Sequence, residues 1–188
     1  MRIRTIAEQR CSRAGSLLSC FLLLLGGCQL TNVPNQIEAQ VQRVISGHTV
    51  DVLISNQDPP LMARIRMIGI EAPSWKQKPW GDQAKTCLQK ILSEISETGD
   101  QKSVMLELDV EEKDRYSRWL AYVWLDGVLV NEQLVAKGCA LASPLVPNNK
   151  YDANISRAQE YARIMGYGIW NPDQPLRLTP AEFRRQNP

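Results

Sequence analysis

The chain has 188 residues, a length that predicts one domain with appended segments. Its hydrophobic content of 44% is that of an ordinary globular protein, so we expect a packed core. Residues 1–27 carry four arginines and one glutamate, and the remainder carries 18 basic and 19 acidic side chains, a net charge of −1. Bulk charge beyond residue 27 therefore gives no support for nucleic-acid binding, which would need a local basic patch.

The N-terminal segment has the pattern of a secretory signal. Four arginines precede a short apolar run, Leu17–Leu25, and the run ends in Gly-Gly-Cys28, which resembles a bacterial lipobox. This pattern predicts an exported chain that is anchored at the cell envelope through a lipid on Cys28, with residues 1–27 removed and 28–40 forming a polar tether. The alternatives are secretion as a soluble or periplasmic protein and an uncleaved anchor.

Hydrophobic periodicity then predicts strands at 41–54 (broken at Ser46-Gly47), 61–70, 103–110, 119–125 and 128–130, with Asp126-Gly127 as a hairpin turn. Helices are predicted at 82–96, at 132–137 after an Asn131 cap, at 152–165, and after a capping box at Thr179. The order favours an α+β, mainly β fold. We expect a five-stranded OB-fold barrel with about three helices over 41–171, and a C-terminal tail over 172–188 with a short helix. A curled sheet without barrel closure is the broader alternative.

Two of the five cysteines remain once the N-terminal segment and Cys28 are set aside. In an oxidising compartment Cys87 and Cys139 could form a disulfide. Free cysteines, in contrast, commonly pack as small buried hydrophobes. The sequence leaves both alternatives open, and it also leaves open whether Trp75 and Trp80 stack on bases or pack against the domain.

The most specific pattern is the run Asp114-Arg-Tyr-Ser-Arg118-Trp-Leu-Ala-Tyr-Val-Trp124. It resembles a motif of the staphylococcal-type thermonucleases, from which only Ser117 departs. A second motif of that family corresponds to Ser46-Gly-His-Thr-Val50 followed by Arg66-Met-Ile-Gly-Ile-Glu-Ala-Pro-Ser74. The resemblance extends over about 41–170 and implies an OB barrel with three helices that hydrolyses phosphodiester bonds in DNA or RNA.

The same resemblance assigns phosphate-binding arginines. It makes Arg66 and Arg118 the catalytic pair, and it places Arg115 and Tyr116 where the family binds a terminal phosphate. A planar guanidinium suits this role because it can grip two oxygens as negative charge develops on the phosphate. Taken singly, either catalytic arginine could be an exposed charge at a strand end.

The acidic part of the family site is mostly replaced. The resemblance implies a Ca²⁺ ion held by two aspartates and a carbonyl, with a glutamate acting on water. These positions hold His48, Glu71, Ala72 and Ser74. Ca²⁺ prefers carboxylate oxygens, imidazole suits zinc and other transition metals, and serine is no general base without a base beside it. A divalent metal at Glu71 and His48 is thus expected only if the site is active, and His48 could instead be a base or a plain loop residue.

Two main functions remain open at this stage. One is a nuclease-family phosphodiester hydrolase at the cell envelope with a degenerate metal and base site. The other is a catalytically inactive lipoprotein that binds nucleic acid or another polyanion through the retained arginines. A structural lipoprotein without a polyanion ligand is a third hypothesis. We predict no protein partner.

Overall fold

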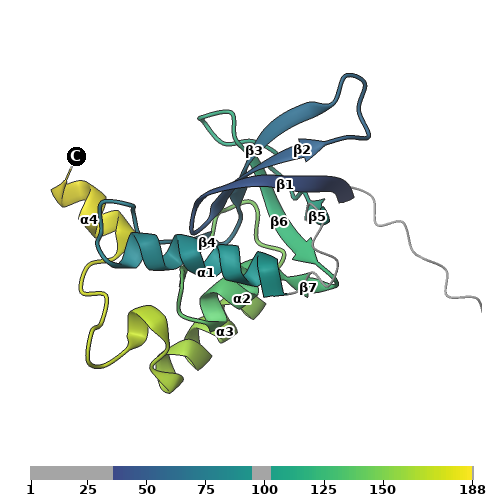
Figure 1. The fold of residues 1–188 in the computed structure, drawn as a ribbon. Helices are drawn as coiled ribbons and strands as arrows, with labels where there is room; N and C mark the ends of the chain where they lie inside the picture. Colours follow the sequence, from purple (N-terminus) through teal and green to yellow (C-terminus); the bar gives the residue numbers. More distant parts are fainter. Residues whose placement is uncertain (1–35, 95–102, 188) are drawn as a thin grey trace, which may run out of the picture. The chain divides into compact units, whose positions relative to one another are not determined.

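The computed structural model describes residues 36–94 and 103–187 (Figure 1). The predicted signal, Cys28 and most of the predicted tether lie outside these residues. Strand β1 (Gln36–Ser46) begins within the segment predicted as a tether, because residues 36–40 pair antiparallel with β5 (Ser103–Glu107). Alternation explains the earlier start: Ala39 is buried in the core while polar neighbours point outward.

A closed barrel organises the strands. β1, β2 (Thr49–Ile54) and β3 (Leu61–Met67) form an antiparallel meander, and β5 and β6 (Trp119–Leu125) continue the sheet on the other side of β1. Parallel pairing of β3 with β6 closes the sheet. The predicted five-stranded OB-fold barrel is therefore confirmed. At the Asp126-Gly127 turn both residues have positive φ, 49° and 78°, and β7 (Val128–Leu129) pairs back onto β6.

Four helices and several short elements complete the described residues. α1 (Trp80–Glu94) contacts β1, α2 (Val130–Ala136) contacts β6, and α3 (Asp152–Met165) packs on α2 (Figure 1). The two-residue strands β4 (Ile70–Glu71) and β8 (Leu141–Ala142) pair with each other. The remaining elements are a 3₁₀ turn, η1 (Gly168–Trp170), and a C-terminal helix, α4 (Pro180–Gln186).

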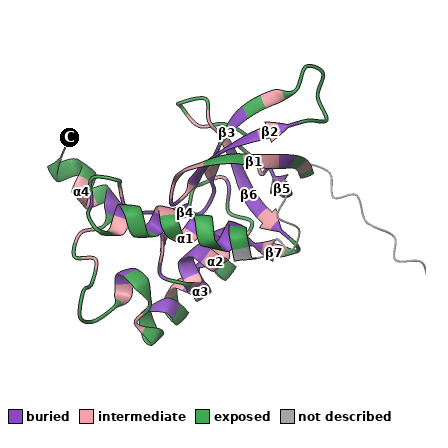
Figure 2. Cartoon of the chain, viewed as in Figure 1, coloured by how far each residue is buried: buried purple, intermediate pink, exposed green. Residues whose placement is uncertain are grey.

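Helices α1, α3 and α4 each have buried residues. The inward faces of α1 and α3 are buried, and α4 buries Pro180 (Figure 2). Among the described residues no helix combines the length and the apolar composition needed to span a membrane.

Asn131 has a different role from the one predicted. We expected a helix cap, but α2 starts at Val130 and makes no side-chain cap bond. Instead Asn131 is fully buried: its Oδ1 accepts a hydrogen bond from Val123 N at 2.9 Å, and its Nδ2 donates one to Ile68 O at 2.8 Å. A buried amide needs such partners. The residue therefore ties α2 to β6 and to the turn after β3, a long-range contact that local sequence could not indicate.

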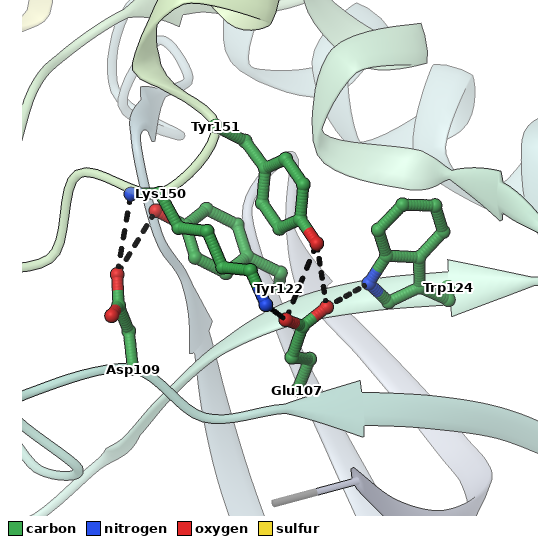
Figure 3. A network of polar contacts seen from close by, with 6 residues as sticks. All are labelled: Glu107, Asp109, Tyr122, Trp124, Lys150 and Tyr151. Atoms are coloured by element: carbon green, nitrogen blue, oxygen red, sulfur yellow. Dashed lines mark hydrogen bonds and ion pairs between the residues drawn. The ribbon is translucent and has the colours of Figure 1, made fainter. Parts of the chain in front are cut away.

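A second buried polar group fixes the loop before α3. Figure 3 shows Glu107, whose side chain is only 3% exposed, surrounded by three donors from two segments, β6 and the residues before α3. Trp124 Nε1 donates to it at 2.8 Å, Tyr151 OH at 3.0 Å, and the Lys150 ammonium forms an ion pair with it. Burial of this carboxylate is therefore fully compensated. The network holds the segment before α3 against the barrel.

Asn148, two residues before Lys150, fixes the position of the loop after β5. It is fully buried, and its amide bonds both backbone groups of Glu111, accepting from the N–H at 2.7 Å and donating to the carbonyl at 2.8 Å. The loop after β5, which carries the residues from Glu111 to Arg118, is thereby fixed at its start.

Cys87 in α1 and Cys139, after α2, form a disulfide across a sequence separation of 52 residues. Of the two alternatives left open by the sequence, the structure shows pairing. In a chain-entropy estimate, closing a loop of this length stabilises the folded state by about 4 kcal/mol.

Candidate functional site

Closure of the barrel brings the two predicted catalytic arginines to one place. Arg66 lies near the end of β3 and pairs in register with Leu120 of β6, while Arg118 directly precedes β6. Both line a pocket of about 1020 Å³. Its other lining residues come from the turns after β1 and β3, from β4, the loop after β5, β6, α4 and the segment before α3. They are His48, Gly69, Glu71, Glu111, Glu112, Lys113, Asp114, Arg115, Tyr116, Leu120, Ser143, Leu145 and Arg184.

Asp114 orients Arg118. One carboxylate oxygen accepts the backbone N–H groups of Tyr116 and Arg118 at 2.9 and 3.0 Å, and the other accepts Arg118 Nε at 2.7 Å. Burial alone would raise the pKa of Asp114, but these hydrogen bonds outweigh it and lower that pKa. Asp114 therefore stays ionised and holds the guanidinium at the pocket wall, with Arg118 28% exposed.

Arg66 is more enclosed. Its Nη1 donates to the carbonyl of Met67. Burial, with smaller contributions from the positive charges of Arg118 and Arg184, lowers the pKa of Arg66 to about 10 against the opposing effect of Glu71 and Asp114. The group is still cationic at neutral pH, but it lies close to other cations without a carboxylate bonded to it.

Arg115 and Tyr116 form the outer rim. Arg115 Nη2 donates to the Tyr116 hydroxyl at 2.8 Å, and its guanidinium carbon lies 4.8 Å from the centre of the Tyr116 ring. Tyr116 is 63% exposed. Both side chains are accessible to a ligand that enters the pocket, as the resemblance implies for a second phosphate.

Gly47 and Ala72 fix the position of His48. A Cβ at residue 47 would lie 2.6 Å from the Cβ of Ala84 and 2.7 Å from that of Ala72, so only glycine fits between them. The backbone N–H of Ala72 then donates to His48 Nδ1 at 2.9 Å.

This hydrogen bond decides the tautomer of His48. A backbone N–H can only donate, so Nδ1 carries the lone pair and the proton of the neutral ring lies on Nε2. Burial, together with the charges of Arg66, Arg118 and Arg184, lowers the pKa of His48 well below its ordinary value. His48 is therefore neutral and offers a donor at Nε2. Neither nitrogen has a free lone pair, which disfavours both the metal-ligand and the general-base alternatives.

Glu71 is the one acid that remains of the residues to which the resemblance assigns metal and water chemistry, and its carboxylate already forms an ion pair. An Arg184 nitrogen of α4 lies 2.5 Å from Glu71 Oε1, and the Glu71 side chain is 19% exposed. No motif in the sequence indicated Arg184 as a site residue. The capping box predicted the helix that carries it, but nothing local indicated where that helix would pack.

The donor set does not fit a calcium ion. Within the described segments no three His, Cys, Asp or Glu side chains cluster as metal ligands. Of the two residues predicted as ligands, Glu71 is bonded to Arg184 and His48 presents N–H rather than a lone pair. Ca²⁺ needs several oxygen ligands, chiefly carboxylates, and one shared carboxylate does not supply them.

Ser74 is not among the described residues that line the pocket. Its carbonyl accepts the backbone N–H of Gln77 at 2.8 Å, and its hydroxyl accepts that of Lys76 at 3.4 Å. Next to it, Trp75 is 70% exposed, so its ring is available for stacking rather than packed in the core. The structure thus gathers Arg66, Arg118, Arg115, Tyr116, His48 and Glu71 into one pocket and leaves Ser74 outside it.

His48 predicts a pH-dependent loss of stability that is easy to isolate, since it is the one histidine in the sequence. Its folded-state pKa lies below the unfolded value of about 6.5, so the unfolded chain binds the extra proton. The stabilisation is complete above about pH 6.5 and falls as the pH drops, by up to about 1.4 kcal/mol per pH unit. Urea unfolding should show a flatter pH profile for His48→Gln over this range. An equally steep fall in the variant would contradict the assignment.

Comparison with known proteins shows the family to which this chain is related. A family model described as staphylococcal nuclease homologue matches residues 64–172. A thermonuclease of Staphylococcus hyicus is 35% identical over 142 residues, which cover 73% of this chain and 78% of that protein. A thermonuclease of Staphylococcus intermedius is 36% identical over 135 residues, covering 69% and 74%. The SPbeta prophage-derived endonuclease YokF of Bacillus subtilis is 28% identical over 142 residues, covering 72% and 44%. The chain therefore belongs to the staphylococcal nuclease homologue family and is, at the level of that family, a nuclease-like hydrolase.

Proposed function

We propose that this chain binds nucleic acid by its phosphodiester groups in the pocket formed around His48, Arg66 and Arg118. The observation that supports this most directly is the convergence of guanidinium groups on one pocket of about 1020 Å³. Arg118 and Arg184 line the same pocket as Arg66, and their positive charges contribute to lowering the pKa of Arg66.

Like charges held this close oppose one another, and their repulsion is relieved when an anion enters. The oxygens of one phosphate can accept hydrogen bonds from several guanidinium groups at once, and each guanidinium–phosphate contact can be bidentate. The His48 Nε2–H adds a neutral donor that a phosphate oxygen can accept. Since the charge beyond residue 27 is −1 overall, this local basic cluster, rather than bulk charge, would draw a polyanion to the protein.

The chemistry of the pocket favours binding over cleavage. Cleavage by the route that the resemblance implies needs an oxygen-rich metal site and a base that acts on water. Here Glu71 is the one carboxylate of that set, it is paired with Arg184, and Ser74 replaces the glutamate. The arginines stabilise charge on a phosphate but supply no base.

Substitution of the pocket arginines tests the proposal. Binding of a short fluorescent single-stranded oligonucleotide, followed by anisotropy, should weaken by about ten-fold or more for Arg66→Ala and for Arg118→Ala, because each loses charge-assisted hydrogen bonds to phosphate. Affinity should also fall as salt rises. Arg157→Ala is the matched control, since Arg157 is exposed on α3 and is not a pocket-lining residue. Binding that is indifferent to salt and to both pocket variants would end the proposal.

A second candidate function is phosphodiester hydrolysis, and one observation favours it. The two arginines to which the resemblance assigns catalysis face the same pocket, and named relatives are thermonucleases. A nuclease zymogram with Ca²⁺, Mn²⁺ and Zn²⁺ added separately distinguishes it from binding alone. Cleavage by the unmodified protein with any of these metals supports the second candidate over the first.

Restoring the missing acids tests whether only they are lacking. We expect the unmodified protein to leave the oligonucleotide intact and His48→Asp combined with Ser74→Glu to cut it in Ca²⁺. The Glu71–Arg184 pair is half-exposed on the arginine side, at 54%, so it should contribute at most about 1 kcal/mol and yield to the ion. The single His48→Asp variant is the control. A double variant that folds, binds oligonucleotide and still fails to cut would show that more than the acids has changed.

We propose further that the chain is exported and lipid-anchored through Cys28. The signal pattern of residues 1–27 supports this, and so does the Cys87–Cys139 disulfide, because disulfides persist in oxidising compartments outside the cytosol.

Expression in a bacterial host tests the anchor. Cys28→Ser should move the protein from the membrane fraction to the soluble exported fraction, because the lipid chains that bury CH₂ groups in the bilayer cannot be attached. Cys20→Ser, in the apolar run, is the control and should remain with the membrane. A Cys28→Ser protein that stays in the membrane fraction would favour an uncleaved anchor.

A further inference from the structure

The C-terminal helix α4 lies beyond the part of the chain that the family model matches. That match ends at residue 172, whereas α4 spans Pro180–Gln186. Yet its Arg184 lines the same pocket as Arg66 and Arg118. The pocket therefore includes a side chain from a segment outside the matched domain.

Local contacts determine where α4 begins. Thr179 forms the predicted capping box: its hydroxyl accepts the Glu182 N–H at 3.3 Å, and Glu182 Oε2 accepts the Thr179 N–H at 2.8 Å. Pro180, at the first helical turn, is buried. These features stabilise the start of a helix that is too short to be stable alone.

Tertiary contacts hold α4 beside the N-terminal end of α1 (Figure 1). The buried Gln77, in the loop that leads into α1, donates from Nε2 to the carbonyl of Leu178 at 2.6 Å. Within the helix, Arg184 forms an ion pair with Glu71 of β4. The C-terminal segment that carries α4 therefore contacts both the loop after β4 and β4 itself.

The charge of the pocket depends on Arg184. Its lining contains five basic side chains and four acidic ones, so the loss of Arg184 would leave no excess of positive charge. Among the described residues, Arg184 is the one cation that forms an ion pair with Glu71. The influence of Arg184 reaches further, because its charge contributes to lowering the pKa values of both His48 and Arg66.

From these contacts we infer that α4 is part of the ligand site, and that Arg184 is a phosphate-binding residue that takes over the neutralisation of Glu71, so that phosphate binds without a metal ion. This inference rests on the proposed binding function. A guanidinium suits both tasks, since one edge of its fork can bond a carboxylate while its remaining N–H donors face a second anion. The poor fit of the pocket to Ca²⁺ agrees with this arrangement, because Arg184 neutralises the charge of Glu71.

The test compares two neighbouring arginines of α4. In Arg184→Gln and in the matched control Arg185→Gln the helix loses the same charge, but only Arg184 lines the pocket. Oligonucleotide affinity in EDTA should fall about ten-fold for Arg184→Gln and stay within about two-fold for Arg185→Gln. Loss of one phosphate contact should also reduce the salt slope by about 0.7 for Arg184→Gln, an effect that a merely structural role would not produce. Arg184→Lys, which keeps the charge without the fork, should recover part of the affinity.

The outcomes separate this inference from the function on which it rests. Unmodified protein should bind equally in EDTA and in Ca²⁺. If it binds but EDTA abolishes the binding, or if Arg184→Gln matches Arg185→Gln in affinity and salt slope, the inference fails while the proposed function stands. If the unmodified protein binds no oligonucleotide at low salt, the proposed function fails and the inference with it. Thermal unfolding by circular dichroism confirms that each variant is folded before binding is measured.

Discussion

The parallel pairing of β3 with β6 is the constraint on which the site depends. It is the contact that closes the barrel, and it sets Arg66 of β3 level with Leu120 of β6, just past Arg118. Without closure, the two arginines would be carried by strands that are separated by the rest of the sheet. Barrels remove open edges because each strand finds a partner, so the same hydrogen bonds that satisfy the backbone also fix the distance between the cations.

Bringing cations together has a cost that the surrounding structure offsets unevenly. Arg118 has Asp114 and Arg184 has Glu71, each as a direct partner. Arg66 has only the Met67 carbonyl as a hydrogen-bond acceptor, and it is the arginine whose pKa is lowered. A site with a cation that is buried and incompletely compensated is prepared for an anion, since ligand binding supplies the missing partner. The fold stabilises this arrangement elsewhere, through the Cys87–Cys139 disulfide and the buried networks of Glu107 and Asn131.

Sequence patterns predicted the elements and site residues that depend on neighbouring positions in the chain. Alternation predicted the strands, the capping box predicted α4, and the two motifs placed Arg66, Arg118, Arg115 and Tyr116 in what proved to be one pocket. What could not be predicted depends on contacts between distant segments. The bond from the Ala72 N–H selects the tautomer of His48, and the packing of α4 puts Arg184 on Glu71. The predicted cap at Asn131 was wrong for the same reason. An amide before a helix can cap the helix or bond a distant strand, and the sequence does not show which strand lies beside it.

The contacts that shape the pocket are independent of the acids that it lacks. Gly47 fits between Ala84 and Ala72 whatever residue follows it, and the pairing of Thr49 with Arg66 joins β2 to β3 through the backbone. At position 48 the histidine accepts the Ala72 N–H through Nδ1, so no buried donor is left unpaired. At position 71 the carboxylate forms an ion pair with Arg184. Positions 48 and 71 thus each have a partner within the protein, and Arg66 and Arg118 line the same pocket although the acids of the family are mostly replaced. The barrel and Asp114 position Arg66 and Arg118, and neither of them depends on the acids that are replaced at positions 48 and 74.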